Sequence, residues 1–174
     1  MRKLLSVLLL FLTVFILTSC SSLNKTKKIG IIQLVDHSSL NLIHSNIVSE
    51  LKLNGYTESD INYVNCSGDM SNVLTAVNTM QGNNTKAVIA ITTPVAQACH
   101  SLAKKKPVVF SAVSDPVAAG LMDDLNHPNN NITGTSDAIA VKDIMDTALL
   151  FNPLIKSVGF IYNPGESNSV SNLE

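Results

Sequence analysis

The sequence has 174 residues, of which 45% are hydrophobic and 14% are charged, and its net charge at pH 7 is −1. A balance this close to zero, without a basic patch, argues against a nucleic-acid partner. The four histidines and three cysteines are scattered along the chain, and no group of them has the spacing of a zinc site.

The chain begins with a segment typical of secretory signal peptides. Two basic residues precede an apolar run from residue 4 to 17, which is shorter than the about 20 residues that a membrane-spanning helix needs. The letters LTSC, ending at Cys20, resemble the lipobox of bacterial lipoproteins, whose cysteine is lipidated. We therefore expect residues 1–19 to be a lipoprotein signal peptide, Cys20 to hold the protein on the extracytoplasmic face of the cell membrane, and residues 20–27 to be a tether. The alternative is an ordinary signal peptide with an incidental cysteine.

From residue 28 onward, β-branched apolar runs alternate with segments of helical periodicity. Strands are predicted at 28–35, 61–66, 87–91 and 107–113, and helices at 38–55, 69–80 and 94–105. Strands and helices that alternate at this spacing predict βαβ units and a parallel sheet with right-handed crossovers.

Two features of this first part concern single residues. The run Lys104 to Lys106 is expected to be the solvated last turn of a helix, where positive charges interact favourably with the helix dipole. Cys66 and Cys99 are compatible either with a disulfide in an oxidising exterior or with two unpaired, half-buried thiols, and the sequence supplies no geometry that decides between these alternatives.

A polar stretch rich in asparagine, at residues 126–137, separates this part from a second one. A helix is predicted at 140–153, followed by a strand in SVGFIYN at 157–163 and the opening of another helix. We therefore divide the chain into an N-terminal α/β lobe at 28–133 and a hinge crossover with an incomplete second α/β lobe at 134–174.

Ligands of parallel α/β sheets bind beyond the carboxyl ends of the strands. Two polar groups at this edge suggest a zwitterionic ligand. Thr92 and Thr93 precede Pro94, which suits a helix start whose free N–H groups favour a carboxylate, and Asp115, beside Ser114, suits an ammonium group. The alternative is that Thr93 is a helix N-cap and Asp115 an ordinary turn residue.

Enzyme signatures are lacking in the sequence. No G-x-G-x-x-G follows the first strand, and neither a Walker loop nor a G-x-S-x-G elbow is found. Asp36, His37 and Ser38 carry the letters of a catalytic triad, but adjacent residues cannot relay a proton in that geometry. We therefore expect neither catalysis nor a cofactor, and we expect His37 to line a cleft or cap a helix.

Five segments together resemble the substrate-binding lipoproteins of ABC transporters, in the subgroup associated with tryptophan, phenylalanine and tyrosine. They are KIGIIQLVDHSSLN, AVIAITTPVAQA, PVVFSAVSDPVAAGL, NITGTSDAI and KSVGFIYNPGESNS, which cover the chain from about Lys28 to its end. The resemblance implies a periplasmic-binding-protein type I-like fold, in which two α/β lobes close on an amino acid about a hinge. It also implies ABC permease subunits as partners.

The resemblance also implies a set of ligand-binding residues. From the first lobe these are Gln33, His37, Thr92, Thr93, Ser114 and Asp115; at the crossover, Asp137; and from the second lobe, Asn163, Glu166, Ser167 and Asn168. Thr135 and Ser136 would also lie at the crossover.

The chain departs from this family in its length. Such proteins run to about twice this size and have a complete second lobe. The sequence is thus expected to be a fragment, a truncated gene product or a shortened relative. Two other functions stay open: a ligand-sensing or interaction module of the same fold, and a non-functional remnant.

Overall fold

The computed structural model describes residues 28–82, 84–128 and 130–173, so the predicted signal peptide, Cys20 and the tether lie outside the described residues. The helices and strands, in chain order, are β1 (Lys28–Gln33), α2 (Ser38–Leu53), the 3-10 helix η1 (Glu58–Asp60), β2 (Ile61–Asn65), α3 (Met70–Met80), β3 (Thr85–Ile91), α4 (Thr93–Cys99), the 3-10 helix η2 (His100–Lys104), β4 (Val108–Val113), β5 (Ile132–Ser136), α5 (Val141–Phe151) and α6 (Ser167–Ser171). All the strands and helices predicted between residues 28 and 113 are present.

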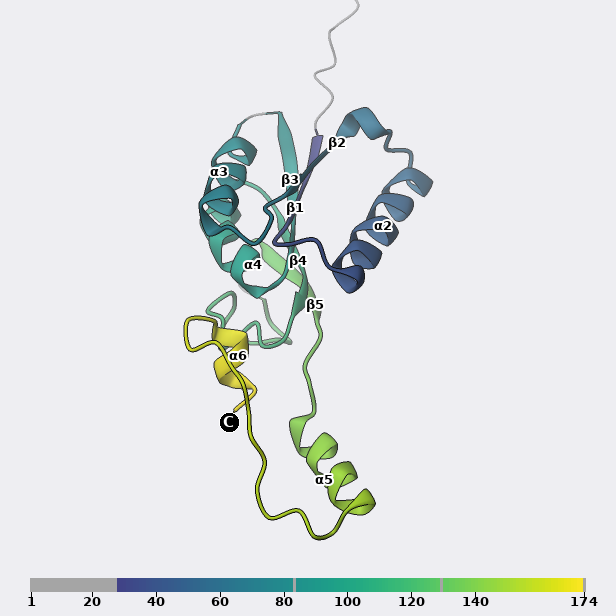
Figure 1. Ribbon diagram of the computed structural model, residues 1–174. Coiled ribbons are helices and arrows are strands. Elements are labelled where there is room, and N and C mark those ends of the chain that lie inside the picture. Colours follow the sequence, from purple (N-terminus) through teal and green to yellow (C-terminus); the bar gives the residue numbers. More distant parts are fainter. Residues whose placement is uncertain (1–27, 83, 129, 174) are drawn as a thin grey trace, which may run out of the picture.

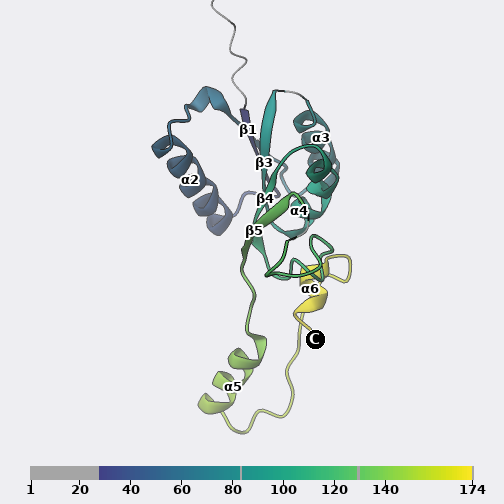
Figure 2. The ribbon, with the colours of Figure 1, turned by 180° about the vertical axis from the view of Figure 1, so that it is seen from behind.

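The strands form one parallel sheet of five strands in the order β2-β1-β3-β4-β5. Helix α2 covers one face of the sheet, and α3 and α4 cover the other (Figures 1 and 2). Since the chain winds outward in both directions from β1 and β3, the order of the strands reverses between these two. In open α/β sheets the ligand site lies beyond the carboxyl ends of the strands at such a reversal.

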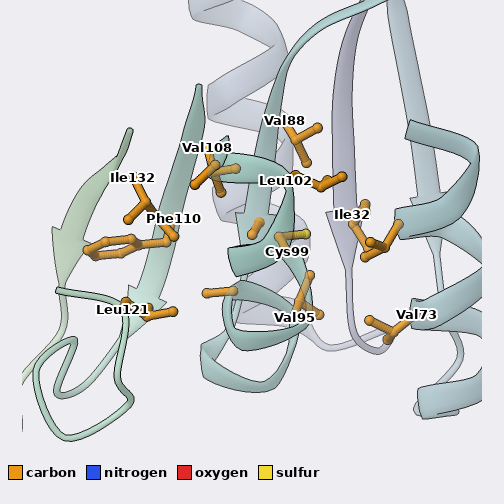
Figure 3. Packing of buried hydrophobic residues seen from close by; sticks show 14 of the residues in the cluster. Ile32, Val73, Val88, Val95, Cys99, Leu102, Val108, Phe110, Leu121 and Ile132 are labelled. Carbon is orange, nitrogen blue, oxygen red and sulfur yellow. The ribbon is translucent and has the colours of Figure 1, made fainter. Parts of the chain in front are cut away.

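Most of the hydrophobic core lies on the face covered by α3 and α4. Val73 of α3, Val95 of α4 and Phe110 of β4 are fully buried there, as Figure 3 shows for the labelled side chains. On the other face a smaller cluster joins Ile29, Ile31 and Ile91 to α2, and no residue of α2 is fully buried. The α2 face is therefore the more thinly covered side of the sheet.

The two cysteines of the described chain are both unpaired and both belong to the larger core cluster. Of the two alternatives left open by the sequence, the structure has the unpaired thiols, and they are completely buried where half-buried thiols were considered. Burial raises the pKa of Cys66, and it raises the pKa of Cys99 to about 12. Because the thiolate is the reactive form, these side chains behave as small apolar core residues.

The expectation that Lys106 is solvated was wrong. Its side chain is buried, and Nζ donates hydrogen bonds to the carbonyl oxygens of Met80 (2.6 Å), Gly82 (2.9 Å) and Thr85 (3.0 Å). Carbonyl groups at the end of a helix lack partners within the helix and carry the negative end of its dipole. Lys106 therefore caps α3, which lies far from it in sequence.

Strand β5 was not predicted, because it lies in the polar stretch that was interpreted as a boundary. Only Ile132 of this strand is buried. At Gly134 a Cβ atom would lie 2.1 Å from the carbonyl oxygen of Phe110, so a residue without a side chain is needed for β5 to pair with β4. The sheet thus runs through the predicted lobe boundary at residue 133.

The predicted strand at 157–163 is absent. The helix before it, α5, is present, but residues 152–166 form no helix or strand, and α5 lies away from the sheet (Figures 1 and 2). Ile161 is 102% exposed and Val158 is 70% exposed. A strand needs a neighbour for its hydrogen bonds, and this segment has none within the described chain.

The described part of the chain contains no helix with the length and apolar character to span a membrane.

Candidate functional site

The carboxyl ends of β1 and β3 meet at the point where the strand order reverses. Gln33, the last residue of β1, is in register with Ile91, the last residue of β3. Thr92 follows directly, so Gln33 and Thr92 come to the same edge of the sheet. The topology therefore brings together two of the residues predicted from the sequence.

Gln33 has an acceptor atom without a partner. The side chain is completely buried, and Nε2 donates to the carbonyl oxygen of Val35 (2.8 Å) and to Oδ1 of Asn41 (2.7 Å), whose own amide donates to Asp36 (2.6 Å). These bonds fix the amide, but Oε1 is buried and accepts no hydrogen bond from the described residues. A buried acceptor without a partner costs about 1–3 kcal/mol, which a donor on a ligand would recover.

Thr92 combines backbone strain with a buried hydroxyl. Its φ is +93°, a value that β-branched residues rarely adopt. The backbone is held there because Thr92 N–H donates to the carbonyl oxygen of Ser111 (2.9 Å) and its own carbonyl accepts from Ala96 (3.0 Å). Oγ1 is buried without a hydrogen-bond partner in the described chain. Strain of this kind concentrates at functional sites, where the surrounding structure enforces it.

The helix α4 begins directly after Thr92. Thr93, its first residue, is buried, and Pro94 follows in the first turn. The N-cap is thus Thr92 and not Thr93, and Thr92 makes no side-chain capping bond. The sequence alternative, in which Thr93 is the N-cap, was therefore wrong by one residue.

Asp115 has the turn role that the sequence left open. Its Oδ1 accepts hydrogen bonds from the N–H groups of Val117 (3.0 Å) and Ala118 (2.9 Å). Both bonds go to the same oxygen of a half-buried carboxylate. The carbonyl oxygen of Ser114 accepts from Ser136 Oγ (2.9 Å), which ties this loop to β5. The turn uses only Oδ1, so it does not conflict with a ligand contact through Oδ2.

Two predicted residues lie at the exposed rim of this edge. His37 is the N-cap of α2, and its Nδ1 accepts from the N–H of Ser39 (3.3 Å). The capping role, one of its two expected roles, is therefore present. Asp137 is exposed, and its backbone N–H donates to the carbonyl oxygen of Val113 (3.1 Å). These contacts of His37 and Asp137 are structural and do not by themselves indicate a ligand.

The second part of the chain returns to the first lobe, and a cavity lies between them. Asn163 Nδ2 donates to Glu166 Oε1 (3.0 Å), and Asn163 Oδ1 accepts from the N–H of Gly165 (3.0 Å). All three residues line a cavity of about 430 Å³. The first lobe lines it with Leu34, Gly68, Met70, Leu74, Pro94, Gln97 and Ala98. This cavity lies next to the strand ends, because Leu34 follows Gln33 and Pro94 follows Thr93.

The last two predicted residues lie in α6. Ser167 lines a neighbouring cavity of about 330 Å³, which it shares with Ala118 and Pro164. Ser167 Oγ and Asn168 Oδ1 are both buried without a hydrogen-bond partner in the described chain. The structure therefore brings Asn163, Glu166 and Ser167 to the same end of the first lobe as Thr93, although none of the predicted first-lobe residues lines either cavity.

Sequence reasoning missed the apolar lining of the larger cavity. Met70 and Leu74 are four residues apart on α3, where they are 43% and 56% exposed. The buried residues Val73 and Val77 have the same spacing of four residues, and together the four positions form one continuous apolar stripe of the helix. The sequence therefore does not distinguish the exposed edge of this stripe from its buried part. In the described residues no group of three metal-ligating side chains is found.

Comparison with known proteins supports the same fold. The family model "ABC transporter substrate binding protein" matches residues 28–174. The Tyrosine-binding protein of Clostridioides difficile is 35% identical over 148 residues, which are 83% of this chain and 43% of that protein.

Three solved structures give the same result. A domain from Streptococcus pneumoniae in complex with L-Trp has a TM-score of 0.77 at 36% identity, covering 84% of this chain and 50% of that one. A conserved domain protein from Vibrio cholerae has a TM-score of 0.79 at 34% identity, covering 85% and 51%. A ligand-free, open substrate-binding protein from Clostridium difficile has a TM-score of 0.69 at 37% identity, covering 84% and 51%. These likenesses confirm the predicted fold class, and the chain spans about half the length of the relatives it matches.

Proposed function

Because the chain belongs to the family of ABC transporter substrate-binding proteins, we propose that it binds a free amino acid with an aromatic side chain and delivers it to the permease of an importer. The names of two relatives, one a tyrosine-binding protein and one solved with L-Trp, support this class of ligand. The lipid on Cys20 would hold the protein on the extracytoplasmic face of the membrane.

The observation that carries the proposal is the pair of buried oxygens at the strand reversal. Gln33 Oε1 and Thr92 Oγ1 both lack partners in the described chain. The Gln33 oxygen only accepts hydrogen bonds and therefore suits an ammonium group, whereas the Thr92 hydroxyl can donate to a carboxylate. Asp115 adds negative charge for the ammonium group. A zwitterion matches this arrangement better than a neutral solute does.

The second segment supplies the opposite side of the site in this proposal. Asn163 and Glu166 reach the cavity beside Pro94, and Ser167 and Asn168 have buried oxygens nearby. A small-molecule site normally buries most of its ligand between two walls. The residues predicted from both lobes are therefore assigned to ligand contact as a set.

The test compares L-phenylalanine, L-tyrosine and L-tryptophan with their amides and with the decarboxylated amines, by ligand-observed NMR and calorimetry. We expect the free amino acids to bind most tightly, because removing either charge of the ligand leaves a polar group of the site without its charged hydrogen-bond partner. Asp115→Asn keeps the oxygen that caps the turn and removes the charge, and it should weaken binding by about 1.5–3 kcal/mol.

Asp146→Asn is the matched control, because Asp146 is exposed on α5 and pairs with Lys142. It should leave the affinity unchanged. Equal affinity for amino acid and amide, or an Asp115→Asn variant that binds like the control, would refute the zwitterion assignment.

A further inference from the structure

Asp36, Asn41 and Gln33 are joined by hydrogen bonds between their side chains, and we call this series the amide relay. We infer that Asp36 and Asn41 are positioning residues, which fix the Gln33 amide so that its oxygen, and not its nitrogen, is left for a ligand. The site then selects a ligand that carries an amino group. This inference rests on the proposed function and adds two residues outside the predicted ligand-binding set.

The direction of each bond in the amide relay follows from the carboxylate of Asp36. A carboxylate only accepts hydrogen bonds, so the Asn41 atom that lies 2.6 Å from Asp36 Oδ1 is the amide nitrogen Nδ2. Asn41 Oδ1 therefore faces Gln33, and it accepts from Gln33 Nε2 at 2.7 Å. If the Asn41 amide were reversed, an oxygen would face the carboxylate and a nitrogen would face Gln33 Nε2, and both bonds would be lost.

A second acceptor holds the Gln33 amide in the same orientation. Gln33 Nε2 also donates to the carbonyl oxygen of Val35 (2.8 Å). An amide nitrogen carries two hydrogens, so these two bonds use both of them. The remaining polar atom of the buried side chain is Oε1, which accepts no hydrogen bond from the described residues. Gln33 can therefore offer only an acceptor to a ligand.

The fold places Asn41 where the amide relay needs it. Asn41 lies in the first turn of α2, where its backbone N–H donates to the carbonyl oxygen of His37 (2.8 Å). Helical side chains tilt toward the N-terminus of their helix, which brings Asn41 back to the loop between β1 and α2. Asp36 lies in this loop. Asp36 and Asn41 are exposed and Gln33 is buried, so the amide relay leads from the surface to the end of β1.

The side-chain amide of Gln33 provides a direct measurement in the whole chain. In protein labelled with ¹⁵N, both Gln33 amide protons should exchange slowly with water because both are hydrogen bonded. L-phenylalanine at saturation should move the Gln33 Nε2 signal downfield, since Oε1 then accepts from the ammonium group. 3-Phenylpropanoate, which has the same ring and carboxylate but no ammonium group, should not. The amide of Asn46, exposed on α2, is the internal control and should stay in place.

A set of variants tests the role of Asn41 through the ratio of the affinities for L-phenylalanine and 3-phenylpropanoate, measured by ligand-observed NMR. Asn41→Ala interrupts the amide relay at constant net charge. It should lower this ratio about fivefold to tenfold and change the affinity for 3-phenylpropanoate less than about twofold. Asn46→Ala is the matched control and should change neither affinity.

The double variant Asp36→Asn with Asn41→Asp exchanges the carboxylate and the amide. The new amide at position 36 can donate to the new carboxylate at position 41, which still accepts from Gln33 Nε2. The net charge is unchanged and the orientation of the Gln33 amide is kept. The affinity ratio should therefore return to within about twofold of the ratio of the original chain.

The outcomes separate the inference from the function on which it rests. If L-phenylalanine binds but Asn41→Ala lowers both affinities alike, or lowers neither, Asn41 serves only the fold, and the inference is overturned while the proposed function stands. If Asn41→Ala does not fold, Asp36→Asn takes its place, since Asp36 is exposed, and an unchanged ratio overturns the inference. If no amino acid binds the original chain, both are overturned. A lowered ratio that the double variant restores establishes the positioning role.

Discussion

Replacing Lys106 with methionine removes the charged donor that ends α3 and keeps an unbranched side chain in the same space. Lys106 Nζ donates to the carbonyl oxygens of Met80, Gly82 and Thr85 at 2.6, 2.9 and 3.0 Å. The bond to Met80 is buried, and the other two are partly exposed. In the variant the carbonyl oxygen of Met80 stays buried without a partner, whereas water can reach those of Gly82 and Thr85 in part. The lost bond to Met80 therefore accounts for most of the loss in stability.

The magnitude follows from these bonds. A hydrogen bond from a charged donor contributes about 1.5–3 kcal/mol, and a buried carbonyl left without a partner costs about 1–3 kcal/mol. Removing the charge also removes its desolvation penalty, the same burial that lowers the pKa of Lys106. With the Met80 bond counted fully and the other two in part, we expect the free energy of unfolding to fall by about 2–4 kcal/mol.

Urea unfolding followed by circular dichroism measures this loss. The midpoint should fall while the dependence on urea concentration stays the same, because the folded surface is unchanged. Lys105→Met is the matched control: Lys105 is the exposed neighbour, and its replacement should change the stability by no more than about 0.5 kcal/mol. If the two variants unfold at the same urea concentration, the capping role of Lys106 is refuted.

Three further predictions concern a histidine, a glycine and the lipid site. Burial lowers the pKa of His44, and the nearby Glu58 partly opposes this shift. As the pH falls, His44 is therefore protonated in the unfolded chain at a higher pH than in the folded protein. Stability should fall as the pH drops below about 6.5 and level off below the folded pKa, and His44→Gln should flatten this slope in urea melts at pH 7.5 and 5. Gly134→Ala should lower the stability by about 1–3 kcal/mol, whereas Gly159→Ala, which meets no atom within 4 Å, should not. Cys20→Ser should release the protein from the membrane fraction, and retention of a processed Cys20→Ser protein would exclude a lipid anchor.

The alternation of strands and helices was enough to predict the first lobe, because its strands are covered on both faces and read as continuous apolar runs. Strand β5 was missed for the opposite reason. Only Ile132 is buried in it, and its pairing depends on the absence of a side chain at Gly134. In the sequence, a glycine in a polar stretch looks the same whether it lies in a strand or in a loop. The buried Lys106 was missed because its acceptors lie more than 20 residues away in the chain.

The candidate site was predicted in part, because the edge of the sheet follows from the order of the strands. Thr92 was predicted as a polar residue after a strand and Gln33 from the family resemblance, and the structure brings both to the strand reversal. The positive φ of Thr92 has no sequence signal, since threonine rarely adopts it. The apolar lining of the cavity of about 430 Å³ was missed because Met70 and Leu74 resemble core residues of a helix, and only the fold shows that they are left partly exposed beside the core.

The two sides of the proposed site are held in place by different interactions. Gln33 and Thr92 are fixed by the parallel sheet and by buried side chains, so their geometry is determined by the first lobe alone. The second side follows a stretch with much exposed apolar surface, in which Phe151 is 89% and Leu154 82% exposed. Soluble proteins rarely leave contiguous apolar surface of this kind in water. Since the relatives are about twice as long, the position of Asn163 and Glu166, and with it the affinity for an amino acid, should depend on what covers this surface.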